Sequence, residues 1–391
     1  MDQNNRPRAR RKNVTSGGSG VHKRGDGLGT GKVGSNSQAG QTSSGGAAGK
    51  RAAAGGGSLL LILALIFLPK LLGGGGGGTS SGGGLGDLVG SMLGGAGSSP
   101  AGFSFANEDE NNSGYSASSG GTVDNSVASG SRAKRTKILG NNQDTVTLMV
   151  YMCGTDLESK YGMASSDMAE MAAATYGDNV NIICYTGGCS QWKTQGISNK
   201  VNQIYQIKDG GLKQLVADDG SKAMTSPDTL AGFIQYCAKN FPANRNELIF
   251  WDHGGGSVSG YGYDEKNKSA GSMDLANISK ALKKGGVQFD FIGFDACLMA
   301  TAETALMLND YADYMIASEE TEPGVGWYYT NWVTKLGSNT SMPTVEIGKN
   351  IVDDFVTTCA KKCKGQKTTL SVIDLAEFSN TVPSKLNAFA N

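Results

Sequence analysis

The sequence predicts an α/β fold in residues 144–391, with a mostly parallel sheet that carries helices on both faces. Strand-like and helix-like segments alternate along this part of the chain, which is typical of parallel strands joined by crossover helices. Two strands are short apolar runs that end in small, polar turns, within residues 248–256 and 291–297. Strands of this kind are buried, and ligands bind beyond their carboxyl ends.

The individual elements follow from apolar periodicity and from the turn residues between them. The expected strands are Thr145–Cys153, Val180–Thr186, Glu247–Asp252, Phe289–Asp295, Tyr314–Ser318 and Thr369–Asp374, with Val201–Ile207 as an edge or hairpin strand. The expected helices are Leu157–Tyr176, Ser226–Phe241, Leu275–Lys284, one that begins at Thr301, Val345–Cys363 and a terminal helix. Ser226 caps the second helix and Pro227 fills its first turn, a favourable order of these two residue types.

Two glycine-rich stretches precede the predicted domain. Residues 1–58 contain ten Lys and Arg against two Asp and almost no apolar side chains, so we expect a disordered basic tail. Residues 73–143 are rich in Gly and Ser and are expected to form a flexible linker or pro-segment. Basic glycine-rich arms also bind phosphate, but no nucleic-acid partner is expected here.

A hydrophobic segment at residues 59–72 separates the tail from the linker. It is short for a membrane span, which needs about 20 apolar residues. A cleaved signal is the alternative, but a basic region of nearly sixty residues is too long for a signal peptide. We therefore expect a membrane anchor. The excess of positive charge before it predicts a cytoplasmic N-terminus and an extracytoplasmic domain.

His253 and Cys297 are the candidate catalytic pair. The chain has two histidines and His22 lies in the tail, so His253 is the imidazole available to a folded site. A cysteine nucleophile needs a base, and adjoining strand ends would bring one to Cys297. Structural roles are the alternative, because a cysteine is often a small buried hydrophobe and a histidine beside three glycines fits a turn. Six further cysteines lie in the domain: Cys153, Cys184, Cys189, Cys237, Cys359 and Cys363.

The strings around this pair resemble the clostripain family of cysteine peptidases, which is related to caspases, legumain and gingipains. They read Trp-Asp-His-Gly-Gly-Gly at residues 251–256 and Phe-Asp-Ala-Cys-Leu-Met at residues 294–299. Residues 149–157, 317–324 and 326–327 are also similar to the family. The resemblance spans about Thr145 to Ser318 and implies a caspase-like fold.

The resemblance implies a role for each motif residue. Cys297 would attack the scissile carbonyl and His253 would act as general acid or base. The backbone N–H groups of Gly254 and Cys297 would form the oxyanion hole. Asp252 is expected to be structural.

Specificity in the family comes from an acid in the S1 pocket. Asp295 lies two residues before the thiol and therefore on the same face of the strand, where it would favour Arg or Lys at P1. Glu319, Glu320 and Glu322 follow the next strand, and we expect Glu320 to add negative charge.

Relatives are often activated by a cut after a basic residue between the histidine and the cysteine. Lys266 and Lys268 lie in a polar stretch of this interval and are the candidates. A second expected site is Arg135, in the basic stretch of residues 132–137 at the junction of linker and domain.

Other chemistries fit less well. Lipases with a His-Gly-Gly-Gly loop also need Gly-x-Ser-x-Gly and a separate histidine, which this domain lacks. Clustered zinc ligands and a phosphate-binding loop are not evident either. No cofactor is expected, and a calcium requirement stays open.

The sequence thus predicts a membrane-anchored cysteine endopeptidase at a bacterial cell surface, acting on proteins or peptides with Arg or Lys at P1. The alternative is a catalytically silent binding or display module on the same fold.

Overall fold

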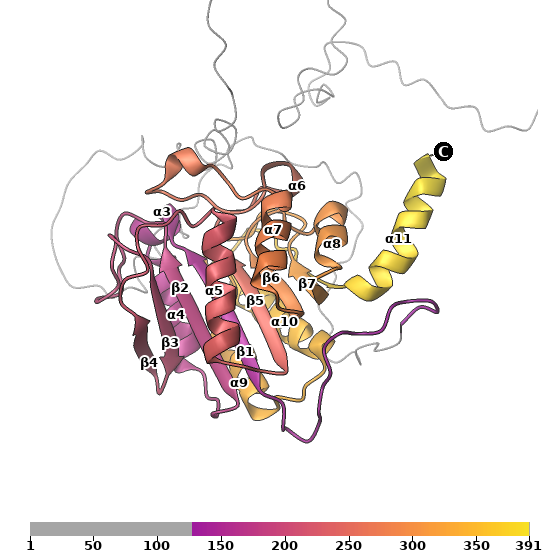
Figure 1. Cartoon of the computed structure of the whole chain (residues 1–391), viewed down its shortest axis with the longest axis horizontal. Helices are drawn as coiled ribbons and strands as arrows, with labels where there is room; N and C mark the ends of the chain where they lie inside the picture. Colours follow the sequence, from indigo (N-terminus) through magenta and orange to yellow (C-terminus); the bar gives the residue numbers. More distant parts are fainter. Residues whose placement is uncertain (1–126, 391) are drawn as a thin grey trace, which may run out of the picture. The chain divides into compact units, whose positions relative to one another are not determined.

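The computed structural model describes residues 127–390 and contains an eight-stranded sheet between layers of helices (Figure 1). The strand order is β4-β3-β2-β1-β5-β6-β7-β8. Strands β2, β1, β5, β6 and β7 are parallel, whereas β3, β4 and β8 pair in antiparallel fashion at the edges. The bounds are β1 Val146–Cys153, β2 Val180–Gly187, β3 Gln203–Lys208, β4 Gly211–Val216, β5 Arg245–Trp251, β6 Phe289–Asp295, β7 Ala312–Ala317 and β8 Ser371–Asp374. The predicted fold class is confirmed.

Helices cover both faces of this sheet. Helices α5, α7 and α8 pack on one face, and α4, α9 and α10 pack on the other. The bounds are α3 Thr155–Ser159, α4 Met163–Ala173, α5 Pro227–Asn240, α6 Gly256–Ser259, α7 Leu275–Gly285, α8 Ala302–Leu308, α9 Tyr329–Ser338, α10 Thr344–Lys362 and α11 Leu375–Ala390.

Strand β1 shows why the sheet needs two helical layers. All eight of its residues are buried, and successive side chains enter opposite layers because the strand repeat is two residues. Tyr151 belongs to the same core cluster as Phe233 of α5. Val150 belongs to the opposite cluster, with Met168 of α4. A strand buried on both faces fixes the centre of the sheet and the direction of its carboxyl end.

Several elements differ from the sequence-based expectation, among them the short helix α6, which was not predicted. The single helix expected at residues 157–176 is divided into α3 and α4, because Gly162 adopts a left-handed φ of 69° before α4. Strand β4 was not predicted, although Asp209 and Gly210 both have positive φ and form the tight turn that an Asp-Gly pair favours. Helix α9 was also not predicted.

Several expectations fall partly or wholly outside the described residues. The basic tail of residues 1–58, the hydrophobic segment of residues 59–72 and the linker up to residue 126 lie there. Residues 127–143, which we expected to belong to the linker, contact the domain. Within residues 127–390, no helix combines the length and the hydropathy of a membrane crossing.

Candidate active site

The residues of the candidate site follow three strands, at the edge of the sheet where the parallel strands have their carboxyl ends. The order of strands reverses between β1 and β5, and ligands bind at such a switch point. Asp156 follows β1, His253 follows β5 and Cys297 follows β6. Strands β5 and β6 are neighbours in parallel register, so the two residues predicted as a pair do emerge from adjoining strand ends.

Two carboxylates hold His253, one at its imidazole and one at its backbone. The ring Nε2 lies 2.9 Å from Asp156 Oδ1, and the backbone N–H of His253 donates to Asp252 Oδ1 at 2.6 Å. Only 8% of the residue is exposed. Burial opposes the positive charge, but the bond to Asp156 and the charges of Asp252 and Asp156 outweigh it, so the pKa of His253 is raised. The structure therefore favours the protonated imidazole.

Asp156 is a functional candidate that the sequence reasoning missed. Burial disfavours its charge, yet hydrogen bonds and ion pairs with His253 and Lys160 hold its pKa well below the usual range. The residue lies inside the segment 149–157 that resembles the clostripain family. That resemblance was the signal that could have found it, but proximity to the imidazole depends on the pairing of β1 with β5.

The thiol of Cys297 is half-buried and accepts a hydrogen bond of 3.2 Å from the backbone N–H of Glu322. Burial, together with the nearby charges of Glu322 and Asp295, raises the pKa of Cys297 to about 11. The protonated thiol is thus the resting form in this structure, and attack requires that its proton be removed. All seven cysteines are free.

The backbones of Gly254 and Cys297 lie directly against each other. A Cβ added to Gly254 would lie 2.1 Å from the carbonyl oxygen of Cys297, closer than side-chain atoms come. Leu298 then turns the chain with a φ of 66°, and its N–H donates to Glu320 O at 3.0 Å. Glycine is needed at position 254 because any other side chain would force the two strand ends apart.

Three acids with buried carboxyl groups cluster around Asp295, and two of them, Asp295 and Glu322, lie near the thiol. Asp295 accepts hydrogen bonds from the backbone N–H of Trp327 and, at 2.8 Å, from the hydroxyl of Tyr329. Asp167 accepts from the indole of Trp251 at 2.6 Å. Glu322 is half-buried, but its carboxyl group is buried beside Asp295, and neither carboxyl oxygen has a well-formed hydrogen bond to the described residues.

Crowding of these acids disfavours their negative charge. Burial raises the pKa of Asp295 to about 6. Burial and the charge of Asp295 raise the pKa values of Glu322 and Asp167 well above the usual range. A cation entering this cluster would favour the ionised form of these carboxyl groups and so lower their pKa values.

From the sequence we expected Glu320 to add negative charge to the candidate pocket. In the structure it is Glu322 whose carboxyl group lies there. The side chain of Glu320 is exposed, and its backbone carbonyl holds the turn after Cys297. A strand end can be predicted from sequence, but which of three nearby acids turns inward depends on the path of the loop after β7. Asp252 stabilises the backbone of the site, because its two carboxylate oxygens accept hydrogen bonds from the backbone N–H groups of His253 and Tyr263 at 2.6 Å.

The predicted processing residues differ in their surroundings. Lys268 is exposed in a short 3-10 turn at Lys268–Ala270. Lys266 is half-buried, and its ammonium group donates to the carbonyl of Lys200 at 3.0 Å. Arg135 is bound to the domain: its N–H donates to both oxygens of Asp313 at 3.0 and 2.8 Å. It does not lie in the loose linker that we expected.

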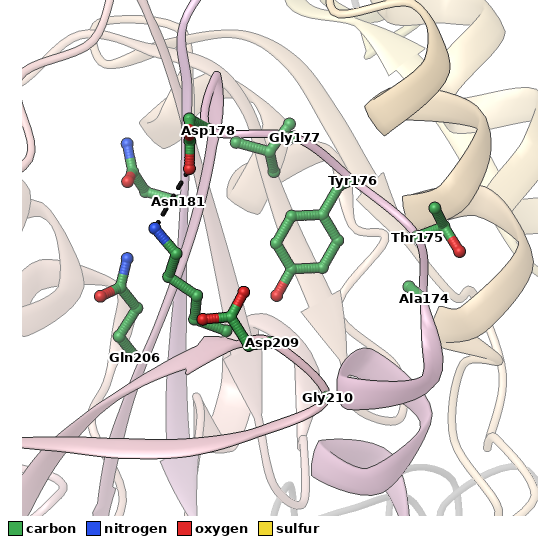
Figure 2. A pocket seen from close by; sticks show the side chains of 11 residues that line it. Ala174, Thr175, Tyr176, Gly177, Asp178, Asn181, Gln206, Asp209 and Gly210 are labelled. Carbon is green, nitrogen blue, oxygen red and sulfur yellow. Dashed lines mark hydrogen bonds and ion pairs between the residues drawn. The ribbon is translucent and has the colours of Figure 1, made fainter.

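A separate cavity of about 320 Å³ lies at the other end of the sheet, near the start of β2 (Figure 2). Its polar lining includes Tyr176, Asp178 and Gln206. It contains none of the candidate catalytic residues. Among the described residues, no group of three or more His, Cys, Asp or Glu side chains is arranged to hold a metal ion.

The fold and the site together define an α/β protein with an imidazole and a thiol at the ends of neighbouring parallel strands. The model of the clostripain family matches residues 150–391, which is more than half of the chain, and the chain belongs to this family.

Individual relatives are more distant. Clostripain from Hathewaya histolytica is 29% identical over 226 residues, which cover 48% of this chain and 41% of that protein. The match therefore spans less than half the length of this curated relative. A secreted C11 cysteine protease from Bacteroides thetaiotaomicron, solved with an irreversible peptide inhibitor, is 25% identical with a TM-score of 0.49, covering 61% of this chain and 68% of that one. An inactive zymogen C11 protease from Parabacteroides distasonis is 23% identical with a TM-score of 0.45, covering 60% and 63% of the two chains.

Proposed function

We propose that this protein is a cysteine endopeptidase that hydrolyses peptide bonds after Arg or Lys, with Cys297 as nucleophile and His253 as acid and base. The observation that carries the proposal is the meeting of the β5 and β6 ends, where Gly254 lies against Cys297 beside a buried acidic cluster. Membership of the clostripain family supports the activity.

The first half of the reaction starts from the neutral imidazole: His253 takes the thiol proton and becomes an imidazolium, and the thiolate attacks the scissile carbonyl carbon. The resulting oxyanion is stabilised by the N–H groups of Gly254 and Cys297. The C–N bond then breaks as the protonated His253 gives its proton to the leaving amine. Asp156 supports this step because it favours the imidazolium form.

In the second half, water attacks the thioester that joins Cys297 to the acyl part of the substrate. His253 takes a proton from that water, the C–S bond breaks, and the thiol is restored with the proton from the imidazolium. The enzyme returns to its starting state, and one water molecule has been consumed for each peptide bond.

The acidic cluster supports the preference for Arg or Lys at P1. The carboxyl groups of Asp295, Glu322 and Asp167 are buried together, and ionising them costs free energy until a cation joins them. Asp295 already has hydrogen-bond donors, whereas the carboxyl oxygens of Glu322 have hydrogen-bonding capacity left. We therefore assign the main contact with the P1 cation to Glu322, with Asp295 holding the pocket in shape.

Activation by self-cleavage after Lys268 fits the loop in which this residue lies. The chain is anchored on both sides of it. On one side Asp264 accepts the N–H of Met224 at 2.8 Å, and on the other Met273 pairs with Tyr261. A cut after Lys268 would leave both new ends attached while the exposed loop between them is freed. Lys266 is the secondary candidate.

The location of the enzyme is proposed from the sequence alone. Residues 59–72 would anchor the chain with residues 1–58 in the cytoplasm and the peptidase domain outside. Protease treatment of intact cells would digest an outward-facing domain and spare it if the orientation is reversed.

The activity is tested with fluorogenic peptides that end in Arg, Lys or Asp. The full-length chain is compared with Cys297→Ala and with Cys237→Ala, a matched control in α5, before and after a brief trypsin treatment that opens the Lys268 loop. We expect cleavage after Arg and Lys alone, lost in Cys297→Ala and kept in Cys237→Ala. Activity that survives Cys297→Ala would exclude this nucleophile. No cleavage by any protein would favour a silent binding module.

A further inference from the structure

The chain segment before β1, drawn in purple in Figure 1, is attached to the domain by hydrogen bonds of an arginine side chain. The guanidinium of Arg132 donates to Asp313 Oδ1 at 2.6 Å, to the carbonyl of Ala312 at 2.7 Å and to the side-chain oxygen of Asn309 at 2.9 Å. These partners lie at the end of α8 and the start of β7. Charge-assisted, multidentate contacts of this kind are the strongest hydrogen bonds that arginine makes.

The backbone of the same segment is bound by the same carboxylate. Asp313 is 1% exposed, and its oxygens also accept the N–H groups of Arg135 and Thr136 at 2.8 Å. One buried acid therefore receives a side chain and two consecutive backbone amides of the segment. If the segment left, this carboxylate would face solvent instead of its three donors.

Lys134 adds a second point of attachment. Its ammonium group forms an ion pair with Asp374 and lies 4.0 Å from the centre of the Tyr314 ring. Further upstream, the side-chain amide of Asn380 in α11 donates to the carbonyl of Ser129 at 3.1 Å. The basic stretch is thus held by a carboxylate, an aromatic face and backbone carbonyls along its length.

The attachment lies at the opposite end of the sheet from the thiol. Arg132 bonds to the carbonyl of Ala312, which is paired with Phe289 at the start of β6. Cys297 comes eight residues later, and a strand rises about 3.3 Å per residue, so roughly 25 Å separates the two levels. In the docked state, Arg135 cannot reach the thiol of its own chain.

We propose that Asn309, Asp313, Tyr314 and Asp374 form a docking site for the chain's own basic segment Arg132–Thr136, and that docking protects the bonds after Arg132, Lys134 and Arg135 from Arg- and Lys-specific peptidases. The inference rests on the proposed function only where the peptidase in question is this enzyme itself. A peptidase binds its substrate as an extended, accessible strand, whereas here the amides and basic side chains are already engaged.

Protection of this segment determines where the linker can be cut. The sequence has no Lys or Arg between Lys70 and Arg132. In the proposed orientation Lys70 lies in the anchor and the earlier basic residues lie in the cytoplasm, so an Arg- or Lys-specific peptidase on the domain's side is directed to Lys137, which is exposed and follows the docked segment. In the purified chain, outside the membrane, a cut after Lys70 leaves the docked segment attached to the domain.

Limited trypsin digestion tests the proposal without using the chain's own activity. The full-length chain carries Cys297→Ala, to silence it, and Lys137→Gln, to remove the exposed site. Mass spectrometry identifies the first residue of the resistant fragment, which we expect to be Leu71. Asp313→Asn should speed cuts after Arg132, Lys134 and Arg135 about tenfold or more, because cleavage follows the population of the open segment.

Asp310→Asn is the matched control, since Asp310 is exposed, lies three residues from Asp313 and loses the same charge. It should leave the fragment starting at Leu71. Amide hydrogen exchange in the unaltered chain gives a second measurement, in which Arg135 and Thr136 should exchange at least about tenfold slower than the exposed Ile138. Equally fast exchange at these positions, or parent cuts after Arg132 or Arg135 as rapid as in Asp313→Asn, would overturn the proposal.

Discussion

The Nε2 atom of His253 lies 2.9 Å from Oδ1 of Asp156, although the two residues are 97 positions apart in the sequence. The contact joins the ends of β1 and β5 across the point where the strand order reverses. It fixes the orientation of the imidazole and favours its protonated form. In the proposed reaction, Asp156 is therefore a positioning residue that acts through His253.

Asp156→Asn should lower kcat/KM about 10- to 100-fold while the protein stays folded. The asparagine can keep a hydrogen bond to the ring but loses the negative charge, so the pKa of His253 should fall. Because the neutral imidazole takes the thiol proton, and the pKa of Cys297 is about 11, the acidic limb of the kcat/KM profile follows His253 and should move to lower pH. A pH–rate profile with an Arg peptide measures the shift.

Lys160→Met is the control for this prediction. Lys160 is the other ionic partner of Asp156, at 3.1 Å, and it does not bond to the imidazole. Because the charge of Lys160 lowers the pKa of His253, its removal should move the acidic limb, if at all, to higher pH, opposite to the effect of Asp156→Asn. If Asp156→Asn lowers the rate without moving that limb, the role of Asp156 is in stability alone.

Glu322→Gln should weaken the use of Arg and Lys peptides about 100-fold in kcat/KM, because a buried charge–charge contact with the P1 side chain is lost. The effect should appear mainly in KM. A peptide with an uncharged P1 residue should be used equally by both proteins. Glu320→Gln, at the exposed acid nearby, is the matched control and should behave like the parent.

The acidic cluster also predicts a pH dependence of substrate binding. Burial raises the pKa of Asp295 to about 6, so this carboxyl is charged above that pH and neutral below it. Binding of an Arg peptide should therefore strengthen as pH rises through about 6, and it should release a proton. Calorimetry of Cys297→Ala with an Arg peptide in buffers of different ionisation enthalpy would detect that proton. Uptake of a proton would contradict the arrangement.

Gly254→Ala should abolish cleavage, because the added methyl group would lie 2.1 Å from the carbonyl oxygen of Cys297. Either the β5 or the β6 end must move, and both carry a reacting or stabilising group. Gly232→Ala in α5 is the matched control, since no atom lies within 4 Å of an added methyl group there. It should retain full activity and gain stability of roughly 0.5–1 kcal/mol from its better helix propensity. Activity near the parent level in Gly254→Ala would mean that the strand ends do not touch in solution.

Glu247→Gln should stabilise the protein at pH 8. Glu247 is fully buried in β5, its carboxyl oxygens have no hydrogen bond to the described residues, and burial raises its pKa from 4.5 to about 8. The folded state therefore holds a proton that the unfolded state loses, and stability falls by up to about 1.4 kcal/mol per pH unit between those values. Urea unfolding should give similar stabilities for both proteins near pH 4.5 and a growing advantage for the variant above it. Glu303→Gln, at an exposed position, should show no such divergence.

The positions of the proposed catalytic pair at adjoining strand ends were predictable because each member follows a strongly patterned strand. An apolar run followed by small polar residues identifies a strand end from sequence, as at His253 and Cys297. The partners of these residues were not predictable in the same way. Asp156 follows β1 but lies in the first turn of α3, where an acid is also an ordinary helix-start residue, and Glu322 was one of three acids in a loop.

The contacts of Arg132 could not be predicted from the sequence either. Its surroundings in sequence are rich in Gly, Ser and basic residues, and composition alone predicts a flexible linker. Asp313 reverses that expectation, because a single carboxylate at the start of β7 binds the side chain of Arg132 and two amides that follow it. Composition indicates how much apolar surface a segment can bury by itself. It does not indicate which binding partners another part of the chain provides.

The sequence by itself determined the α/β class, the alternation of strands and helices, and the two strand ends that carry His253 and Cys297, since these depend on local periodicity and turn residues. Only the tertiary structure decided that Asp156 contacts the imidazole, that the carboxyl group of Glu322 is buried and that Arg132 is hydrogen-bonded to the domain. Those contacts join segments far apart in the chain, and their geometry is set by strand order and by packing, which no local pattern encodes.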